Sequence, residues 1–148
     1  MDYSELALEL LNKMQSFHRA TPQKYINEAL QGEAFVLYCI DLYGDDVQPG
    51  SISHKMDVSS ARMAAALNSL ENKGFITRQI DLSDRRKVLI RLTPAGKEQA
   101  GRNRQKVMEA ITQVLQFLGE QDAREYIRIM GRLAELNLEG DHPNEEKV

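Results

Sequence analysis

The sequence of 148 residues has little cysteine and no long apolar run. Its single cysteine, Cys39, cannot form a disulfide within the chain, and such usage is typical of a reducing compartment. The apolar run Ala34–Ile40 has seven residues, whereas a membrane-spanning helix needs about 20. No basic segment precedes an apolar one at the start, so we expect neither a signal peptide nor a membrane partner. The sequence therefore predicts a cytoplasmic protein.

Motifs that carry catalytic or metal chemistry are also missing. The three histidines, His18, His54 and His142, are far apart, and no group of Cys and His residues has the spacing of metal ligands. The sequence contains no nucleophile elbow and no phosphate-binding loop, and no histidine lies near a Ser/Asp pair. We therefore predict that the chain is not an enzyme and holds no metal and no cofactor.

The composition is that of an ordinary globular domain. Apolar residues make up 42% and charged residues 28% of the chain. A chain of this length is expected to form one domain with enough core to fold without disulfides. We place that domain at residues 1–138 and expect a polar, frayed tail at 139–148.

The net charge of −3 conceals an uneven distribution. Residues 54–106 hold twelve Lys and Arg against five acidic residues, a net +7. Residues 1–53 and 107–148 each have a net charge of −5. A cationic segment between two anionic ends favours a polyanionic partner such as DNA. The alternative is that the basic segment pairs with the acidic ends of the same chain.

Helical periodicity dominates the first third of the chain. Residues 4–20 have the pattern of an amphipathic helix. Its apolar positions are Leu6, Leu10, Met14 and Phe17. Thr21-Pro22 is typical of an N-cap followed by proline at the first helical position. Residues 33–43 are apolar on nearly every side, which predicts a buried central helix, and Asp45–Gly50 is a turn-rich loop.

The middle of the chain predicts a helix-turn-helix and a hairpin. A short helix at 51–56 and a second at about 58–73 are joined by a tight turn at Asp57–Ser59. A period of two then indicates strands at 75–81 and 87–92, joined by a cationic loop. The inner face of the second helix is expected to carry Met63, Leu67 and Leu70.

The C-terminal part predicts long helices. Thr93-Pro94 again indicates a cap and a first-turn proline, and Gly119 is expected to break the helix that follows. The apolar stripes on the N- and C-terminal helices are too extensive for an isolated monomer of this size. We therefore expect a homodimer in which two copies cover these stripes.

This order of elements predicts a mainly α fold with a small β-hairpin. It is a winged helix-turn-helix with N- and C-terminal dimerisation helices. Residues 33–93 form the expected DNA-binding lobe, and residues 1–30 and 95–138 form the dimerisation helices. A two-fold dimer carries two reading helices, which fits double-stranded DNA with a palindromic operator.

Three segments together resemble the MarR family of bacterial transcription regulators. They are Leu70–Ile76 (LENKGFI), Asp81–Arg86 (DLSDRR) and Leu92–Gly96 (LTPAG). The resemblance covers about residues 5–138. It implies a homodimeric winged-helix DNA-binding protein, usually a repressor, whose DNA is often released by a small molecule or an oxidation event.

On the second helix of the motif, Ala61, Ala65, Asn68 and Asn72 are expected to point outward, and Arg62 lies on the flank of that face. Arginine suits guanine, asparagine suits adenine, and alanine can touch a thymine methyl group. The resemblance also implies that Arg62 occupies a base-contacting position. Ala64 and Ala65 stand where the family often has polar or basic residues, so sequence choice is expected to rest more on DNA shape. The alternative is an ordinary solvated helix face.

The cationic hairpin tip is the sharpest feature of the sequence. An arginine at such a tip, Arg85 or Arg86, can enter a narrow A/T minor groove. The resemblance implies that Asp84 and Arg86 act together, with the carboxylate orienting the arginine. Asp81, at the strand end, is expected to do similar work. The alternative is a loop that is charged only for solubility.

Further residues are candidates for contacts to the DNA backbone. Hydroxyl groups around the turn either cap helices or bind phosphates, and the basic residues are either phosphate contacts or plain surface charges. These candidates are Ser51, Ser59, Ser60, Lys73, Arg78 and Lys87.

The resemblance also implies an effector pocket between the first helices and the winged helix, and hence a small-molecule ligand. Its candidate lining is Met14, Phe17, His18, Tyr38 and Cys39. The same five residues also suit a plain hydrophobic core. Two alternative functions remain open: a winged-helix module that contacts only proteins, and a thiol-based redox regulator acting through Cys39.

Overall fold

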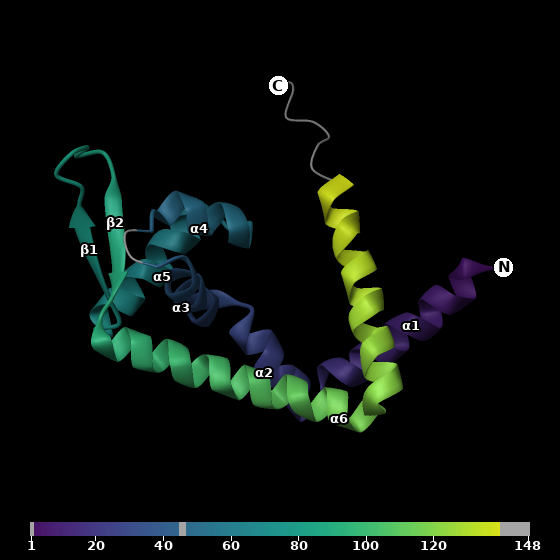
Figure 1. Cartoon of the computed structure of the whole chain (residues 1–148). Helices are drawn as coiled ribbons and strands as arrows, with labels where there is room; N and C mark the ends of the chain where they lie inside the picture. Colours follow the sequence, from purple (N-terminus) through teal and green to yellow (C-terminus); the bar gives the residue numbers. More distant parts are fainter. Residues whose placement is uncertain (1, 45–46, 140–148) are drawn as a thin grey trace, which may run out of the picture. The chain divides into compact units, whose positions relative to one another are not determined.

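The computed structural model of the chain describes residues 2–44 and 47–139, and it consists of helices and one β-hairpin (Figure 1). The elements are α1 (Tyr3–His18), α2 (Thr21–Ala29), α3 (Gly32–Tyr43), α4 (Pro49–Met56), α5 (Ser60–Asn72), β1 (Ile76–Ile80), β2 (Val88–Leu92) and α6 (Pro94–Glu139). This arrangement confirms the predicted mainly α fold with a winged helix-turn-helix.

The chain forms two compact units. The first extends to Ile111 and the second begins at Thr112, so that α6 contributes to both. Gly119 interrupts α6 with φ 78° and ψ 165°, which confirms the break predicted at this glycine. Apart from Glu139, which ends α6, the expected tail at 139–148 lies outside the described residues.

The hydrophobic core of the first unit joins α3, α4, α5 and the hairpin. α5 buries Met63, Leu67 and Leu70 to 3% exposure or less, as its periodicity predicts. Burying side chains of this size stabilises a fold by about 1.5–3 kcal/mol each. The fully buried side chains of the core include Val36, Leu37, Ile40, Ile52, Ile76 and Ile90. This single core therefore holds α5 and the hairpin in place relative to each other.

The prediction that the 33–43 helix is buried on every side is wrong for the described chain. One side of α3 is buried, through Val36, Leu37, Cys39 and Ile40. Tyr38, on the other side, is 42% exposed, and the later residue Leu42 is 58% exposed. The reason is that the side of α3 in the core is covered by neighbours that include α5 and β2, whereas Tyr38 is only partly covered.

Two local predictions also need correction. Thr21 is the first residue of α2 and not its cap, because Ala20 has the extended backbone of a cap and accepts the first helical bond from Lys24 at 3.1 Å. The loop predicted at 45–50 contains a buried residue, Val47, whose carbonyl accepts a hydrogen bond from Ile90 N–H at 3.0 Å. Val47 therefore bridges to the hairpin, a long-range pairing that no local pattern indicates.

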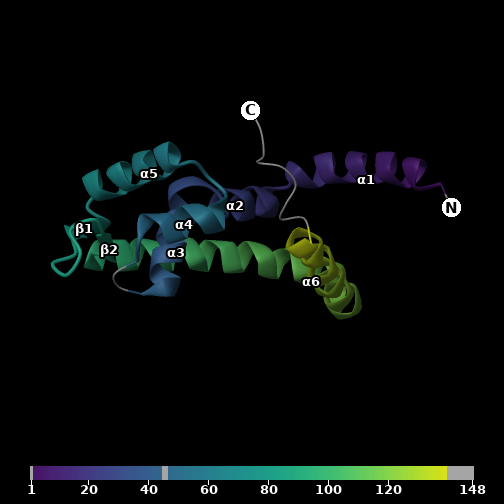
Figure 2. The same cartoon turned by 90° about the horizontal axis from the view of Figure 1, so that it is seen from above.

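The hairpin is antiparallel, with Ile76 opposite Leu92 and Ile80 opposite Val88. Figures 1 and 2 show β1 and β2 side by side at the start of α6. Ile76 is 2% exposed whereas Ile80, on the same face of the strand, is 63% exposed. The base of the hairpin is therefore in the core, and its far end projects from it as a wing.

Hydrogen bonds at Thr93 hold the base of the wing. Its hydroxyl donates to the Gly74 carbonyl at 2.6 Å and accepts from Gly96 N–H at 3.0 Å. The second bond confirms Thr93 as the cap of α6. A Cβ placed on Gly96 would lie 1.9 Å from the carbonyl oxygen of Phe75, the residue before β1, so the close approach of α6 to this residue requires glycine.

Candidate nucleic-acid interface

The turn between α4 and α5 is built by two local features. Asp57 adopts the left-handed conformation, with φ 50° and ψ 49°, and ends α4. Ser59 then caps α5, because its Oγ accepts a hydrogen bond from Arg62 N–H at 3.2 Å. Ser59 therefore has the capping role that was one of its two predicted roles. Ser51 and Ser60 are exposed on α4 and α5.

The outward side of α5 carries the predicted base-reading residues. Arg62, Ala65 and Asn68 are all exposed; Ala65 and Asn68 point away from the side that enters the core, and Arg62 lies on the flank. The Arg62 side chain forms no ion pair with any of the residues that the structure describes. A small side chain, Ala65, between two longer polar ones leaves room for a groove edge to approach the helix.

A hydrogen-bonded network joins α5 to β1. Arg78 Nε donates to Glu71 Oε2 at 2.6 Å, and Arg78 Nη2 donates to Asn68 Oδ1 at 2.7 Å. Asn68 and Glu71 are three residues apart on α5, so both face the same neighbouring strand. The guanidinium of Arg78 is therefore engaged within the chain, which the sequence prediction of a phosphate contact did not anticipate. Glu71 lies in the LENKGFI segment, but the sequence analysis gave it no role at the site.

The wing tip presents two arginines. Asp84 Oδ1 accepts a hydrogen bond from Arg86 N–H at 3.1 Å and lies 3.6 Å from Arg86 Nε. The loop is closed by Lys87 N–H, which donates to the Asp84 carbonyl at 2.9 Å. Arg85 is exposed and has no ion-pair partner within the described ranges. Cationic side chains thus extend into solvent from a loop whose backbone is held by its own hydrogen bonds.

Asp81 has a different role from the one expected. Its Oδ1 accepts hydrogen bonds from the hydroxyl and the backbone N–H of Ser83, at 2.7 and 2.9 Å. These two bonds, with the positive charge of Lys87 nearby, lower the pKa of the Asp81 carboxyl. Asp81 therefore shapes the loop through Ser83 in place of orienting an arginine.

Lys73, a predicted phosphate contact, forms an ion pair with Glu33. Lys73 Nζ lies 2.6 Å from Glu33 Oε2, which links the end of α5 to the start of α3. Hydrogen bonding to Lys73 and Ser69 lowers the pKa of Glu33. Both side chains remain partly exposed, so this pair contributes at most about 1 kcal/mol to stability.

A cavity of about 300 Å³ lies between α2, α3 and the first part of α6. Its walls are mostly apolar, with Asn103 and Arg104 as polar members, and Arg104 pairs with Asp41 at 3.3 Å. The apolar lining includes Ile26, Leu30, Tyr38, Ala100, Val107 and Ile111.

Of the five predicted pocket residues, only Tyr38 lines this cavity. Cys39 belongs to the hydrophobic core, where burial raises the pKa of its thiol. Met14 and Phe17 are exposed on α1. His18 Nδ1 lies 2.9 Å from Asn27 Nδ2 in a surface hydrogen bond. The structure thus does not bring the five residues together.

Within residues 2–44 and 47–139, no group of three or more His, Cys, Asp or Glu residues is arranged to hold a metal ion. None of the described helices is both long and apolar enough to span a bilayer.

Comparison with known proteins finds a similarity to one family of regulators. Residues 31–88 match the model of the MarR family, a stretch that contains α4, α5 and the wing loop. Over this stretch the chain is similar to the MarR family. The match bears out the resemblance drawn from the sequence, and it contains the LENKGFI and DLSDRR segments.

The similarity to individual proteins extends over nearly the whole chain. It is 27% identical to the uncharacterized HTH-type transcriptional regulator YwhA of Bacillus subtilis, over 91% of this chain and all of that one. Its fold is similar to that of the repressor CouR bound to a 23-mer DNA duplex, with a TM-score of 0.69, 19% identity, and coverage of 89% and 94% of the two chains.

A cysteine-to-serine mutant of MarR from E. coli, complexed with operator DNA, has a TM-score of 0.65 and 17% identity to this chain. The match covers 86% of this chain and 95% of the mutant. These proteins are named as regulators and repressors, which bears out the prediction that the chain is not an enzyme.

Proposed function

We propose that the protein is a homodimeric transcription regulator that binds a specific double-stranded DNA site. The observation that carries the proposal is the pairing of an exposed α5 surface with a wing whose Arg86 is held by Asp84 and extends into solvent. In this arrangement α5 enters the major groove and the wing arginine enters the adjacent minor groove. The DNA-bound structures of CouR and the MarR mutant, whose folds are similar, support DNA binding by this fold.

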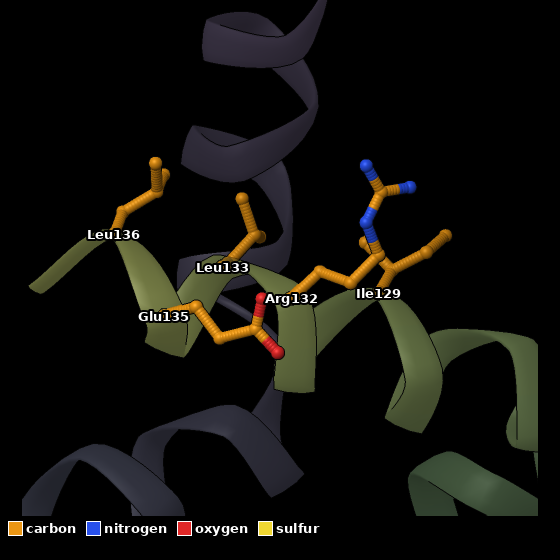
Figure 3. A pocket seen from close by; sticks show the side chains of 5 residues that line it. All are labelled: Ile129, Arg132, Leu133, Glu135 and Leu136. Carbon is orange, nitrogen blue, oxygen red and sulfur yellow. The ribbon is translucent and has the colours of Figure 1, made fainter. Parts of the chain in front are cut away.

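Exposed apolar residues on two helices support the homodimer. On α1, Leu6, Leu10 and Met14 are 46–59% exposed. In the second unit, α6 exposes Leu133 and Leu136 by 51% and 65%. Figure 3 shows both leucines extending from one side of the helix, where they line a surface hollow with Ile129, Arg132 and Glu135. A soluble monomer rarely exposes so much apolar surface, and a second copy would cover it.

We further propose that the protein is a cytoplasmic repressor that a small molecule releases from DNA. The cavity between α2, α3 and α6 supports this, because its lining is mostly apolar and α3 packs directly against α5 and β2. A ligand of modest size and mainly apolar character would fit about 300 Å³. Its binding would shift α3 and, with it, α5 in each copy. The distance between the two α5 helices of the dimer would then change. The repressor role itself rests on the family resemblance.

The proposal is tested by fluorescence-anisotropy titration of the DNA upstream of the protein's own gene. A duplex of equal length and random sequence is the control. We expect tight binding to the upstream DNA, weak binding to the control, and a loss of affinity of about 0.9 log units per log unit of salt for each phosphate contact. Equal weak binding to both duplexes would place the target elsewhere. No binding to either duplex at low salt would instead favour a module that contacts proteins.

A further inference from the structure

We propose that Arg78 is a positioning residue that makes Asn68 a reader of guanine. This inference rests on the proposed DNA binding and concerns what α5 presents to a base. The expectation from residue type alone is that asparagine reads adenine, because its amide donates to N7 and accepts from the N6 amino group. The contacts of Asn68 in the folded chain change that expectation.

The orientation of the Asn68 amide follows from the chemistry of its partner. Arginine has five donors and no acceptor, so only the amide oxygen can face it. Arg78 Nη2 donates to that oxygen at 2.7 Å, and Glu71 holds the same guanidinium through Nε at 2.6 Å. The Asn68 NH₂ group is left without an acceptor among the described residues. Asn68 is exposed, so its NH₂ group can approach the edge of a base from the outward side of α5.

An amide restrained in this way presents hydrogen-bond donors to a DNA base, and it presents no accessible acceptor. The second lone pair of Asn68 Oδ1 does not restore the adenine contact, because the N6 amino group would then lie beside the guanidinium cation. Guanine presents two acceptors in the major groove, O6 and N7, whereas adenine presents one acceptor beside a donor. The network therefore favours guanine over adenine opposite Asn68.

The same network explains why Arg78 is poorly suited to a phosphate. Its charge is compensated by Glu71 at 2.6 Å, and its side chain is only 30% exposed. By contrast, Arg86 at the wing tip is 95% exposed. The wing arginine is free to reach DNA, while the arginine of β1 acts through Asn68.

The test measures binding of the full-length protein to every single-base variant of the tightest duplex selected from a random library. For the wild type we expect one position per half-site at which guanine is preferred over adenine by about fivefold or more. Asn68→Ala should abolish the preference at that position. Arg78→Met keeps the aliphatic stem, frees Oδ1, and should reduce the preference to less than about twofold or reverse it toward adenine.

Two further variants complete the test. Gln79→Met alters the neighbouring, exposed position of β1 and should leave the base profile unchanged. Asn68→Asp keeps an oxygen for Arg78 but has no NH₂ group to donate, so it should also lose the guanine preference. Because this variant retains the bond to Arg78, it remains informative if Arg78→Met fails to fold.

Three outcomes would overturn the inference, and each can be told from the others. The first is a wild-type preference for adenine at the base position that Asn68 reads. It would show that Arg78 does not restrain the Asn68 amide. If Arg78→Met weakened all duplexes equally and lowered the salt slope by about one, Arg78 would be a phosphate contact. If the wild type selected no sequence at all, the proposed function would fail, and this inference with it.

Discussion

Asp84 uses one carboxylate oxygen, Oδ1, to hold both the backbone and the side chain of Arg86. The oxygen accepts from Arg86 N–H at 3.1 Å and lies 3.6 Å from Nε. The Arg86 side chain is nevertheless 95% exposed. Asp84 thus restrains Arg86 through the backbone N–H and through Nε of the guanidinium, while the side chain as a whole remains exposed to a partner. Such a restraint lowers the entropy lost on binding.

Replacing Arg86 tests this arrangement. We expect Arg86→Ala to weaken specific DNA binding by about fivefold to 100-fold and to lower the salt slope by about one, because a cation leaves the interface. Its thermal unfolding should be unchanged, since the side chain contacts little else in the chain. The measurement is an anisotropy titration at several salt concentrations.

A matched control is Arg124→Ala, which removes the same charge from an exposed i,i+4 pair in α6 beyond Gly119. It should leave the salt slope unchanged. Equal effects of the two variants would show that the wing acts only through net charge.

Gly96 and Gly101 provide a paired test of the packing of α6. A Cβ at Gly96 would lie 1.9 Å from the Phe75 carbonyl oxygen, so Gly96→Ala should destabilise the fold by about 1–3 kcal/mol or more. Gly101 has no heavy atom within 4 Å of the corresponding position, and alanine there should stabilise the helix by about 0.5–1 kcal/mol. Urea unfolding of both variants measures the difference. A Gly96→Ala protein as stable as the wild type would contradict the close approach.

The dimer is tested on α1. Leu10 is 59% exposed in the single chain, so Leu10→Glu should change the stability of a monomer very little. In a dimer it would bury an unpaired charge, and we expect the variant to sediment as a monomer at micromolar concentration. Asn12→Glu adds the same charge to another exposed position of α1 and should leave a dimer intact. A wild type that sediments only as a monomer would refute the dimer.

Cys39 should react slowly in the folded protein. Burial raises the pKa of its thiol, so the thiolate fraction at pH 7–8 is below that of a free cysteine, and the side chain is only 2% exposed. We expect labelling by iodoacetamide to be at least about tenfold slower in the native protein than in urea, and to rise with pH above the usual thiol range. Rapid native labelling, together with loss of DNA binding on peroxide treatment, would support the redox alternative instead.

Much of the fold was predictable because its signals are local. The apolar spacing of Met63, Leu67 and Leu70 requires one buried side of α5, and Thr93-Pro94 and Gly119 mark a helix start and a break by their backbone preferences alone. The wing loop was recognised because its cationic sequence is unusual for a tight turn.

The partners of the charged side chains were not predictable in the same way. Glu33 and Lys73 are 40 residues apart in the sequence. Arg78 reaches Asn68 and Glu71 only because the hairpin packs against α5. Periodicity states which side of a helix faces inward, but it does not state which strand lies beside the outward side.

The sequence by itself determined the helices, the wing, the resemblance to the MarR family and the outward residues of α5. Only the tertiary structure decided what those outward residues are free to do. The physical reason is that hydrogen-bonding capacity is shared among neighbours. Arg78 is available to a phosphate, and Asn68 to adenine, only if neither is already engaged by the other, and that depends on a packing contact between two elements.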